Sequence, residues 1–139
     1  MTFLKWALLV LVGSCSSGCM LLGEAVFYTD VRIVAADSEM DVREVVVMTA
    51  YNLSYSLCPD LGDSKTYCKK KIAGQFRELT TDMRQSVLEF ESFGVPDRQR
   101  DAVDAFVSEL KRVCSQCAIS ARARSHWGVS DEVADWKAI

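Results

Sequence analysis

Apolar residues beyond position 37 recur mostly at intervals of three and four, the spacing that places side chains on one face of an α-helix. The segment 37–58 shows this spacing clearly. Ser38 can cap its start, and Pro59 disfavours a helical conformation in the residue before it, so the helix should stop near Cys58. The expected buried face consists of Val42, Val45, Val46, Thr49, Ala50, Leu53 and Leu57. The pattern therefore predicts a first amphipathic helix.

The same spacing predicts a second helix over 64–93 and a third that runs from Asp97 to about residue 121. Gly94 would end the second helix, and Pro96 would open the third with Asp97 as its cap. The apolar stripe of the second helix consists of Ile72, Phe76, Leu79, Met83, Val87 and Phe90. The stripe of the third consists of Val103, Phe106, Val107, Leu110, Val113, Cys114, Cys117, Ala118 and Ala121.

The connections between these segments are short, so neighbouring helices are expected to pack antiparallel. We therefore expect an all-α domain over 37–139: an antiparallel three-helix bundle with a short C-terminal helix from Ser130, which would bury Val133 and Trp136. The segment 24–36 is rich in aromatic and β-branched residues, which indicates a strand or an extended lead. A lone strand has nothing to pair with in such a bundle, so this segment is expected to precede the domain.

Residues 1–23 carry one charge, Lys5, whereas all 19 acidic residues lie at Glu24 or later. A cationic start, the apolar core 6–12 and a following run of small residues have the layout of a secretory signal peptide. A retained membrane anchor is an alternative, because no charge lies between Trp6 and Gly23, although this stretch is at the short end for a span of ~20 residues. Both interpretations place the domain outside the cytoplasm.

The sequence Val12-Gly13-Ser14-Cys15 resembles the lipobox of bacterial lipoproteins, which ends in a cysteine that is diacylated and becomes the first mature residue. The resemblance implies a signal peptide over 1–14, followed by a lipidated N-terminus and extended lead over 15–36. Cys19 is the alternative acylation site, with a signal peptide that extends to residue 18. It fits the lipobox less well, because Ser16 stands where an aliphatic residue is expected.

Cysteine parity favours the alternative site. Acylation of Cys15 leaves five other cysteines in the mature chain, whereas cleavage before Cys19 leaves four, an even number for disulfides. Ser16 directly after Cys15 resembles the pattern of lipoproteins that are sent to the outer membrane. The resemblance thus implies a palmitate-type anchor in the outer membrane, with the domain facing the periplasm. Inner-membrane anchoring and a soluble periplasmic protein stay as alternatives.

Cys58, Cys68, Cys114 and Cys117 are expected to form two structural disulfides at one end of the bundle. We favour Cys68 with Cys117 and Cys58 with Cys114 over two local bridges, although spacing alone cannot choose the pairing. A redox site is less favoured, because Cys114 and Cys117 lie far inside the predicted helix rather than at its N-terminus. A zinc site is also less favoured, because Cys114 and Cys117 form one CxxC pair whereas Cys58 and Cys68 are too far apart in the sequence to form a second. Haem attachment is excluded, because Ala118 stands where a histidine is required.

The net charge of −3 lacks the basic footprint of a nucleic-acid-binding protein. The single histidine, His126, has no evident partner, and the chain has no GxSxG, HExxH, P-loop or GxGxxG motif. Carboxylates such as Glu89 and Glu91 are expected on solvated helix surfaces. We therefore expect no catalytic residue, no metal site and no cofactor.

Tyr51 and Tyr55 lie one helical turn apart, and with Trp127 and Trp136 they are candidates for a partner-binding surface or for packing against the core. The first functional hypothesis is a non-enzymatic cell-envelope lipoprotein, a disulfide-stabilised domain that binds another envelope protein. The second is a periplasmic inhibitor or immunity lipoprotein that blocks a hydrolase or a toxin. The third is a thiol oxidoreductase that uses the CxxC sequence at 114–117.

Overall fold

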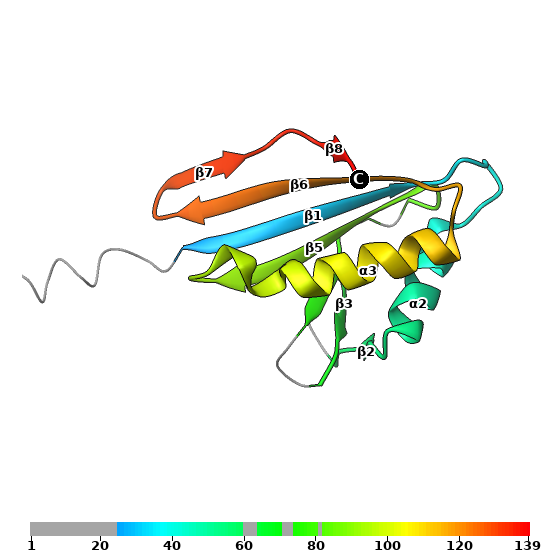
Figure 1. Ribbon diagram of the computed structural model, residues 1–139, viewed down its shortest axis with the longest axis horizontal. Coiled ribbons are helices and arrows are strands. Elements are labelled where there is room, and N and C mark those ends of the chain that lie inside the picture. Colours follow the sequence, from blue (N-terminus) through cyan, green and yellow to red (C-terminus); the bar gives the residue numbers. More distant parts are fainter. Residues whose placement is uncertain (1–24, 60–63, 71–73, 81) are drawn as a thin grey trace, which may run out of the picture.

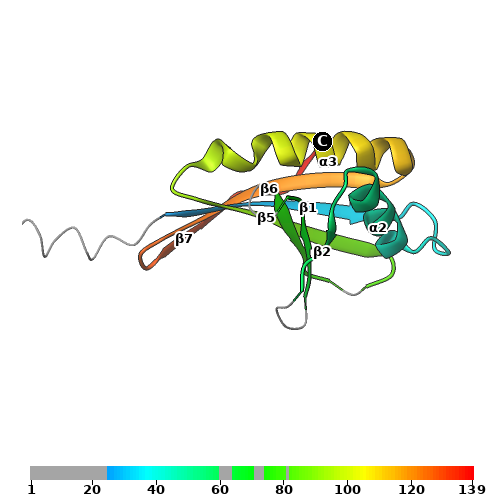
Figure 2. The same ribbon diagram turned by 90° about the horizontal axis from the view of Figure 1, so that it is seen from below.

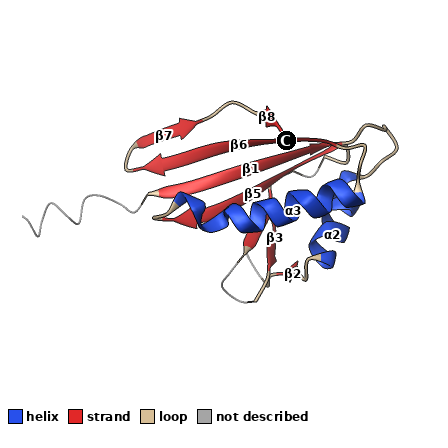
Figure 3. Ribbon diagram, viewed as in Figure 1, coloured by secondary structure: helices blue, strands red, loops and turns tan. Residues whose placement is uncertain are grey.

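The computed structural model describes residues 25–59, 64–70, 74–80 and 82–139. These residues form one antiparallel sheet of eight strands, with two α-helices packed against the same face (Figure 1; Figure 3). The helices are α2 (Val42–Asn52) and α3 (Arg100–Val113), and the 3-10 helix η1 (Pro96–Gln99) leads into α3. The strands are β1 (Val26–Val34), β2 (Ser56–Leu57), β3 (Lys65–Cys68), β4 (Gln75–Glu78), β5 (Gln85–Phe93), β6 (Ala118–Trp127), β7 (Ser130–Val133) and β8 (Lys137–Ala138).

The strand order is β2-β3-β4-β5-β1-β6-β7, and β8 also pairs with β6. Val31 in β1 lies opposite Leu88 of β5 on one side and Ala121 of β6 on the other. The succession β1–α2–β4–β5–α3–β6 with this strand order is the split βαβ, ferredoxin-like arrangement, to which the other strands are added at the edges. The segment expected as a strand or an extended lead is therefore an interior strand of the sheet, paired on both sides.

The predicted all-α bundle is wrong. The segment 64–93 contains β3, β4 and β5 rather than a second helix, because its side chains also alternate with the period of two that a strand requires. In β5, Leu88 and Phe90 are buried in the core, and Glu89 between them points to the other face. Leu79 and Met83, which the helical spacing assigned to a buried stripe, are exposed.

The other predicted helices are shorter than expected. The carboxylate of Asp41 caps α2 in place of Ser38, and the backbone leaves the helix before Ser54, whose φ is +64°. The helix α3 ends at Val113, so the following residues form β6 instead of further helical turns. Ser130 opens β7 rather than a last helix. Ile72 of the predicted second helix lies outside the described residues.

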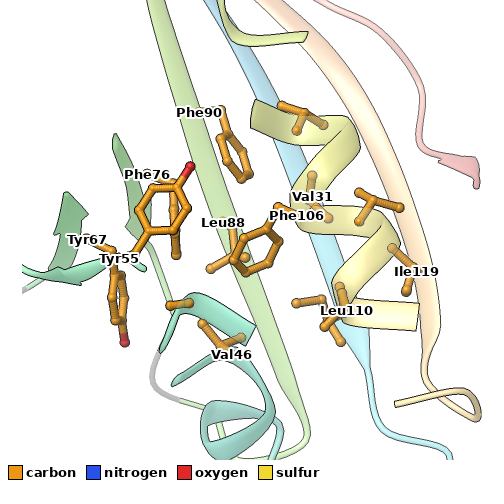
Figure 4. Packing of buried hydrophobic residues seen from close by; sticks show 14 of the residues in the cluster. Val31, Val46, Tyr55, Tyr67, Phe76, Leu88, Phe90, Phe106, Leu110 and Ile119 are labelled. Carbon is orange, nitrogen blue, oxygen red and sulfur yellow. The ribbon is translucent and has the colours of Figure 1, made fainter. Parts of the chain in front are cut away.

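The core lies between the two helices and one face of the sheet (Figure 4). Phe76 is at its centre, with ring centroids 4.7 Å from those of Tyr67 and Phe106 and 5.1 to 5.3 Å from those of Tyr55 and Phe90. The helix α3 contributes Val103, Phe106, Val107 and Leu110. This part of the third predicted apolar stripe is confirmed.

Both disulfides are local. Cys58 bonds to Cys68, with 5.5 Å between their Cα atoms. The antiparallel pairing of β2 with β3 brings Cys58 opposite Thr66, to which its N–H donates, so Cys68 is a diagonal neighbour two residues away. Cys114 bonds to Cys117 across the turn between α3 and β6, with a Cα–Cα distance of 5.4 Å. The favoured pairings of Cys68 with Cys117 and Cys58 with Cys114 are therefore wrong. Those pairings assumed that 64–93 forms a helix that faces the third helix, but this segment forms strands of the sheet.

Candidate functional site

The face of the sheet opposite the helices carries a network of charged side chains. Val31 and Ile33 of β1 point into the core, so Asp30 and Arg32 point to the other side. Cross-strand pairing places Glu89 of β5 beside Asp30 on this side. Within the described residues, no helix covers this open face (Figure 2).

Two carboxylates on the open face are almost inaccessible to solvent. The exposed fraction is 1% for Asp30 and 6% for Glu89. Asp30 accepts hydrogen bonds from Nε of Arg122 at 2.8 Å and from Nε and Nη2 of Arg124 at 2.7 and 2.9 Å. Glu89 accepts hydrogen bonds from Nη2 of Arg124 and Nη2 of Arg77. The result is a continuous chain of ion pairs across β6, β1, β5 and β4.

Arg124 is the central cation of this network. Its hydrogen bonds to Asp30, and then those to Glu89, raise the pKa of the guanidinium above its ordinary value, although partial burial opposes the shift. Its Cζ atom also lies 4.5 Å from the centroid of the Tyr28 ring. Arg124 is thus held in one position by a carboxylate on each of two neighbouring strands.

Trp136 covers the other end of the network. Its ring centroid lies 4.5 Å from Cζ of both Arg32 and Arg122. The pairing of β8 with β6 opposite Ser120 fixes the segment that carries this tryptophan. Nε of Arg32 donates to Oγ of Ser120 at 3.2 Å. We refer to the surface formed by Arg32, Arg77, Arg122, Arg124 and Trp136 as the arginine face.

The arginine face is suited to binding anionic groups. In the described part of the chain, Arg32 and Arg122 form side-chain hydrogen bonds only through Nε, so their Nη donors have no protein partner there. Three of its four guanidinium groups pair with the carboxylates of Asp30 and Glu89, and no ion pair is formed by the fourth, that of Arg32, within the described residues. A shallow hollow of about 160 Å³ adjoins Arg77 and is lined by Glu89, Glu91 and the Cys58–Cys68 bridge. The face therefore combines positive charge, an aromatic ring and a concave edge.

The buried carboxylate on the helix-covered face has neutral partners. Glu78 accepts hydrogen bonds from Oγ of Ser86 at 2.9 Å and from Oη of Tyr67 at 3.4 Å. Burial, together with the nearby Glu78 carboxylate, raises the pKa of Tyr67 to about 12. This pair lies within the aromatic core and presents no ion-binding surface.

The site residues predicted from the sequence are not brought together. Tyr55 is buried against Phe76, whereas Tyr51 is exposed on α2. Trp127 is exposed at the end of β6, and Trp136 covers the arginine face. Only Trp136 therefore belongs to the candidate site. The lipidation candidates Cys15 and Cys19 lie outside the described residues.

The sequence interpretation missed the acidic centre of the site. Glu89 was expected on a solvated helix surface, but it is buried beneath guanidinium groups. The alternation of arginine with alanine through Arg122 and Arg124 was the available signal, because in a strand it places both arginines on one face. Asp30 in β1 and Arg77 in β4 are separated by β5, so the two residues could not be connected without the strand order.

The Cys114–Cys117 bridge lies at the C-terminal end of α3. Thioredoxin-type sites use a helix N-terminus, where the dipole lowers the pKa of a thiol, and the dipole at a C-terminus acts in the opposite direction. Both sulfur atoms contact Sδ of Met40, at 3.6 and 3.7 Å. The position is that of a structural bridge that closes the turn into β6.

The single histidine and the acidic residues of the described ranges form no metal-binding cluster beside the network. His126 pairs with Asp131 on the exposed β6–β7 hairpin. The described ranges contain no group of three histidine, cysteine or acidic side chains that could hold a metal ion. Neither α2 nor α3 is long and apolar enough to span a membrane. No protein-family model, curated protein or solved structure matches the chain.

Proposed function

We propose that this protein is a lipid-anchored domain of the bacterial cell envelope that binds an acidic surface of another envelope protein. The observation that carries the proposed binding activity is the arginine face, on which two buried carboxylates hold the guanidinium groups in place. The signal-like residues 1–14 and the lipobox-like end at Cys15 support the anchor. The domain is proposed as a binding protein rather than an enzyme.

The energetics of buried charge favour a binding role for this network. Desolvation of an ion pair costs about as much as its Coulomb attraction returns, so apolar residues would stabilise the same strands at least as well. Asp30 and Glu89 nevertheless occupy the centre of the sheet with their arginine partners. Guanidinium groups that are fixed before binding lose little conformational entropy when they meet a carboxylate. Arginine and tryptophan are also the residues most enriched at the energetic centres of protein interfaces.

The anchor is tested by growth with labelled palmitate in a bacterial host that processes lipoproteins. We expect the label in the wild-type protein and its loss in Cys15→Ala, together with accumulation of the unprocessed form. Cys19→Ala is the matched control and should retain the label. A Cys15→Ala, Cys19→Ala double variant that is labelled and processed normally would contradict the lipoprotein hypothesis.

The arginine face is tested by quantitative affinity capture from envelope extracts. The Arg32→Gln, Arg122→Gln double variant should recover its partner at least about tenfold less than wild type, because it removes two central guanidinium groups. The Arg98→Gln, Lys111→Gln double variant removes the same charge from η1 and α3, and should capture as wild type does. Circular dichroism establishes that both variants are folded. Equal recovery of the same proteins by both variants would contradict the proposed site.

A further inference from the structure

The end of the sheet at which the described chain begins exposes four large apolar side chains. Trp127 and Val129 lie at the β6–β7 hairpin and are 58% and 105% exposed. Phe93 and Val95 follow from β5 and are 51% and 46% exposed. We refer to these four residues as the apolar end. Exposed apolar side chains that gather at one place are typical of surfaces that contact a partner or a membrane.

The strand register places these residues close together. Val26, the first residue of β1, pairs with Phe93 on one side and with His126, next to Trp127, on the other. Adjacent strands lie ~4.8 Å apart, so the three strands span about 10 Å. Phe93 and His126 both pair with Val26 and lie on the open face with it. Trp127 follows His126 in the strand, so its side chain points to the opposite, helix-covered face. The apolar side chains therefore surround the end of the sheet on both faces.

The hairpin turn projects its apolar residue outward. Trp127 and Ser130 are paired, which leaves a two-residue loop of Gly128 and Val129. Gly128 has a φ of +63°, the conformation that the first position of a type II′ turn requires. Val129 is consequently fully exposed at the tip. A turn of this type commonly carries polar residues, so an apolar tip indicates contact with an apolar environment.

The same end lies nearest to the proposed lipid anchor. The backbone N–H of Gly94 donates to the carbonyl of Ala25, so the chain enters the fold beside Phe93 and Val95. Ala25 lies ten positions after Cys15, a distance along the chain that spans at most about 35 Å. It lies six positions after Cys19, which span at most about 20 Å. Acylation of either cysteine would therefore connect the domain to the bilayer through this end.

We propose that the apolar end inserts into the lipid surface beside the acyl anchor. This inference rests on the lipid anchor of the proposed function. Tryptophan is favoured at the interface between lipid and water, and the tether keeps a high local concentration of lipid at this end. With the apolar end in the membrane, the open face and its arginines stand roughly along the membrane normal, where an envelope protein can reach them.

The test uses the full chain, purified with its acyl anchor and reconstituted in phosphatidylethanolamine–phosphatidylglycerol vesicles that contain brominated acyl chains. Trp136→Phe leaves Trp127 as the tryptophan of the mature domain, because Trp6 is removed with the signal peptide. Bromine in the lipid should quench at least half of the Trp127 fluorescence. The matched control carries Trp127→Phe, Trp136→Phe and Met48→Trp, which places the fluorophore at an exposed apolar position of α2. The control should lose less than a tenth of its fluorescence.

The outcomes separate this inference from the proposed function. Mass spectrometry first establishes the acyl modification, and its absence would overturn both the anchor and this orientation. With the modification present, an unquenched Trp127 would overturn insertion alone and leave the lipoprotein intact. A Trp127 emission shifted to the blue without quenching would identify a protein partner, or a second copy of this chain, as the occupant and would likewise overturn it. Equal quenching in the α2 control would show that the domain has no preferred orientation.

Discussion

The two faces of the central sheet are built from the same strands with opposite chemistry. On one side of β1, Val31 and Ile33 pack in the apolar core beneath the helices, and on the other side Asp30 is held by the side chains of Arg122 and Arg124. Asp30 is nevertheless as inaccessible as Val31. Burial on the first face follows from packing of apolar elements, whereas burial on the second follows from long side chains that lie over a carboxylate. We infer that the first face maintains the fold and that the second is available for binding.

The largest effect on stability should come from the helix-covered face. Phe106→Ala removes a fully buried ring that contacts Phe76 and Phe90, and should lower the free energy of unfolding by about 3–5 kcal/mol. Ser108→Ala, on the exposed side of the same helix, is the control and should change it by less than about 0.5 kcal/mol. Urea denaturation measures both. A loss below 1 kcal/mol for Phe106→Ala would mean that α3 contributes little to the core.

The open face should show a smaller effect when one ion is removed. Asp30→Asn leaves Arg122 and Arg124 without their carboxylate, and should lower the free energy of unfolding by about 2–3 kcal/mol. The cost stays below that of a fully buried unpaired charge because both guanidinium groups are partly in water. Glu91→Gln, also on the open face, is the comparison in the same urea experiment. Equal losses in the free energy of unfolding for Asp30→Asn and Glu91→Gln would show that the ion pairs of Asp30 contribute no more to stability than a partly exposed carboxylate does.

Alkaline pH should destabilise the protein through Tyr67, the partner of the buried carboxylate Glu78 on the helix-covered face. Tyr67 has a pKa of about 12 in the folded protein, against about 10 in an unfolded chain. Its neutral form therefore stabilises the fold fully below pH 10, and this contribution is lost as the pH rises to 12, by roughly 2 kcal/mol. Tyr67→Phe should make the decline between pH 10 and 12 shallower while it changes stability at pH 7 by less than about 1 kcal/mol. Parallel declines in the two proteins would contradict a buried neutral tyrosine beside Glu78.

The smallest effect on stability should come from removing Asp30 together with the two arginines that pair with it. A triple variant with Asp30→Val, Arg122→Thr and Arg124→Thr leaves Glu89 paired with Arg77 and gives β1 and β6 good strand-forming residues. Its free energy of unfolding should stay within about 1 kcal/mol of wild type, because a buried ion pair contributes little net stability. Its capture of the partner should be lost. A triple variant that unfolds would assign the network to stability instead of binding.

Part of the fold followed from local patterns. The apolar stripe of α3 and its entry at Pro96 were predicted, because a helix is specified by residues that are near one another in the chain. The segment 64–93 was misassigned, because spacings of three and four in its apolar residues fit a helix as well as its alternation fits strands. The helical stripe assumed burial of Leu79 and Met83, which turned out to lie outside the core.

The candidate site depended on pairings that no local pattern contains. Asp30 and Arg124 are separated by 94 positions in the sequence and meet only because β1 lies between β5 and β6. The prediction of a lone leading strand with no partner removed this contact from consideration. Once 118–127 is recognised as a strand, the alternation through Arg122 and Arg124 places both on one face, so the arginines were within reach of the sequence. Their carboxylate partners were not.

Site-specific photo-crosslinking in intact cells tests the central claim, that the open face binds a partner, most directly. A photo-reactive amino acid at Val87, opposite Arg32 on the open face, is compared with the same group at Ser108 on the outer surface of α3. We predict a light-dependent adduct with one envelope protein from position 87, its loss in the Arg32→Gln, Arg122→Gln background, and none from position 108. Absence of an adduct at 87, or the same adducts from both positions, would contradict the assignment of the arginine face as the binding surface.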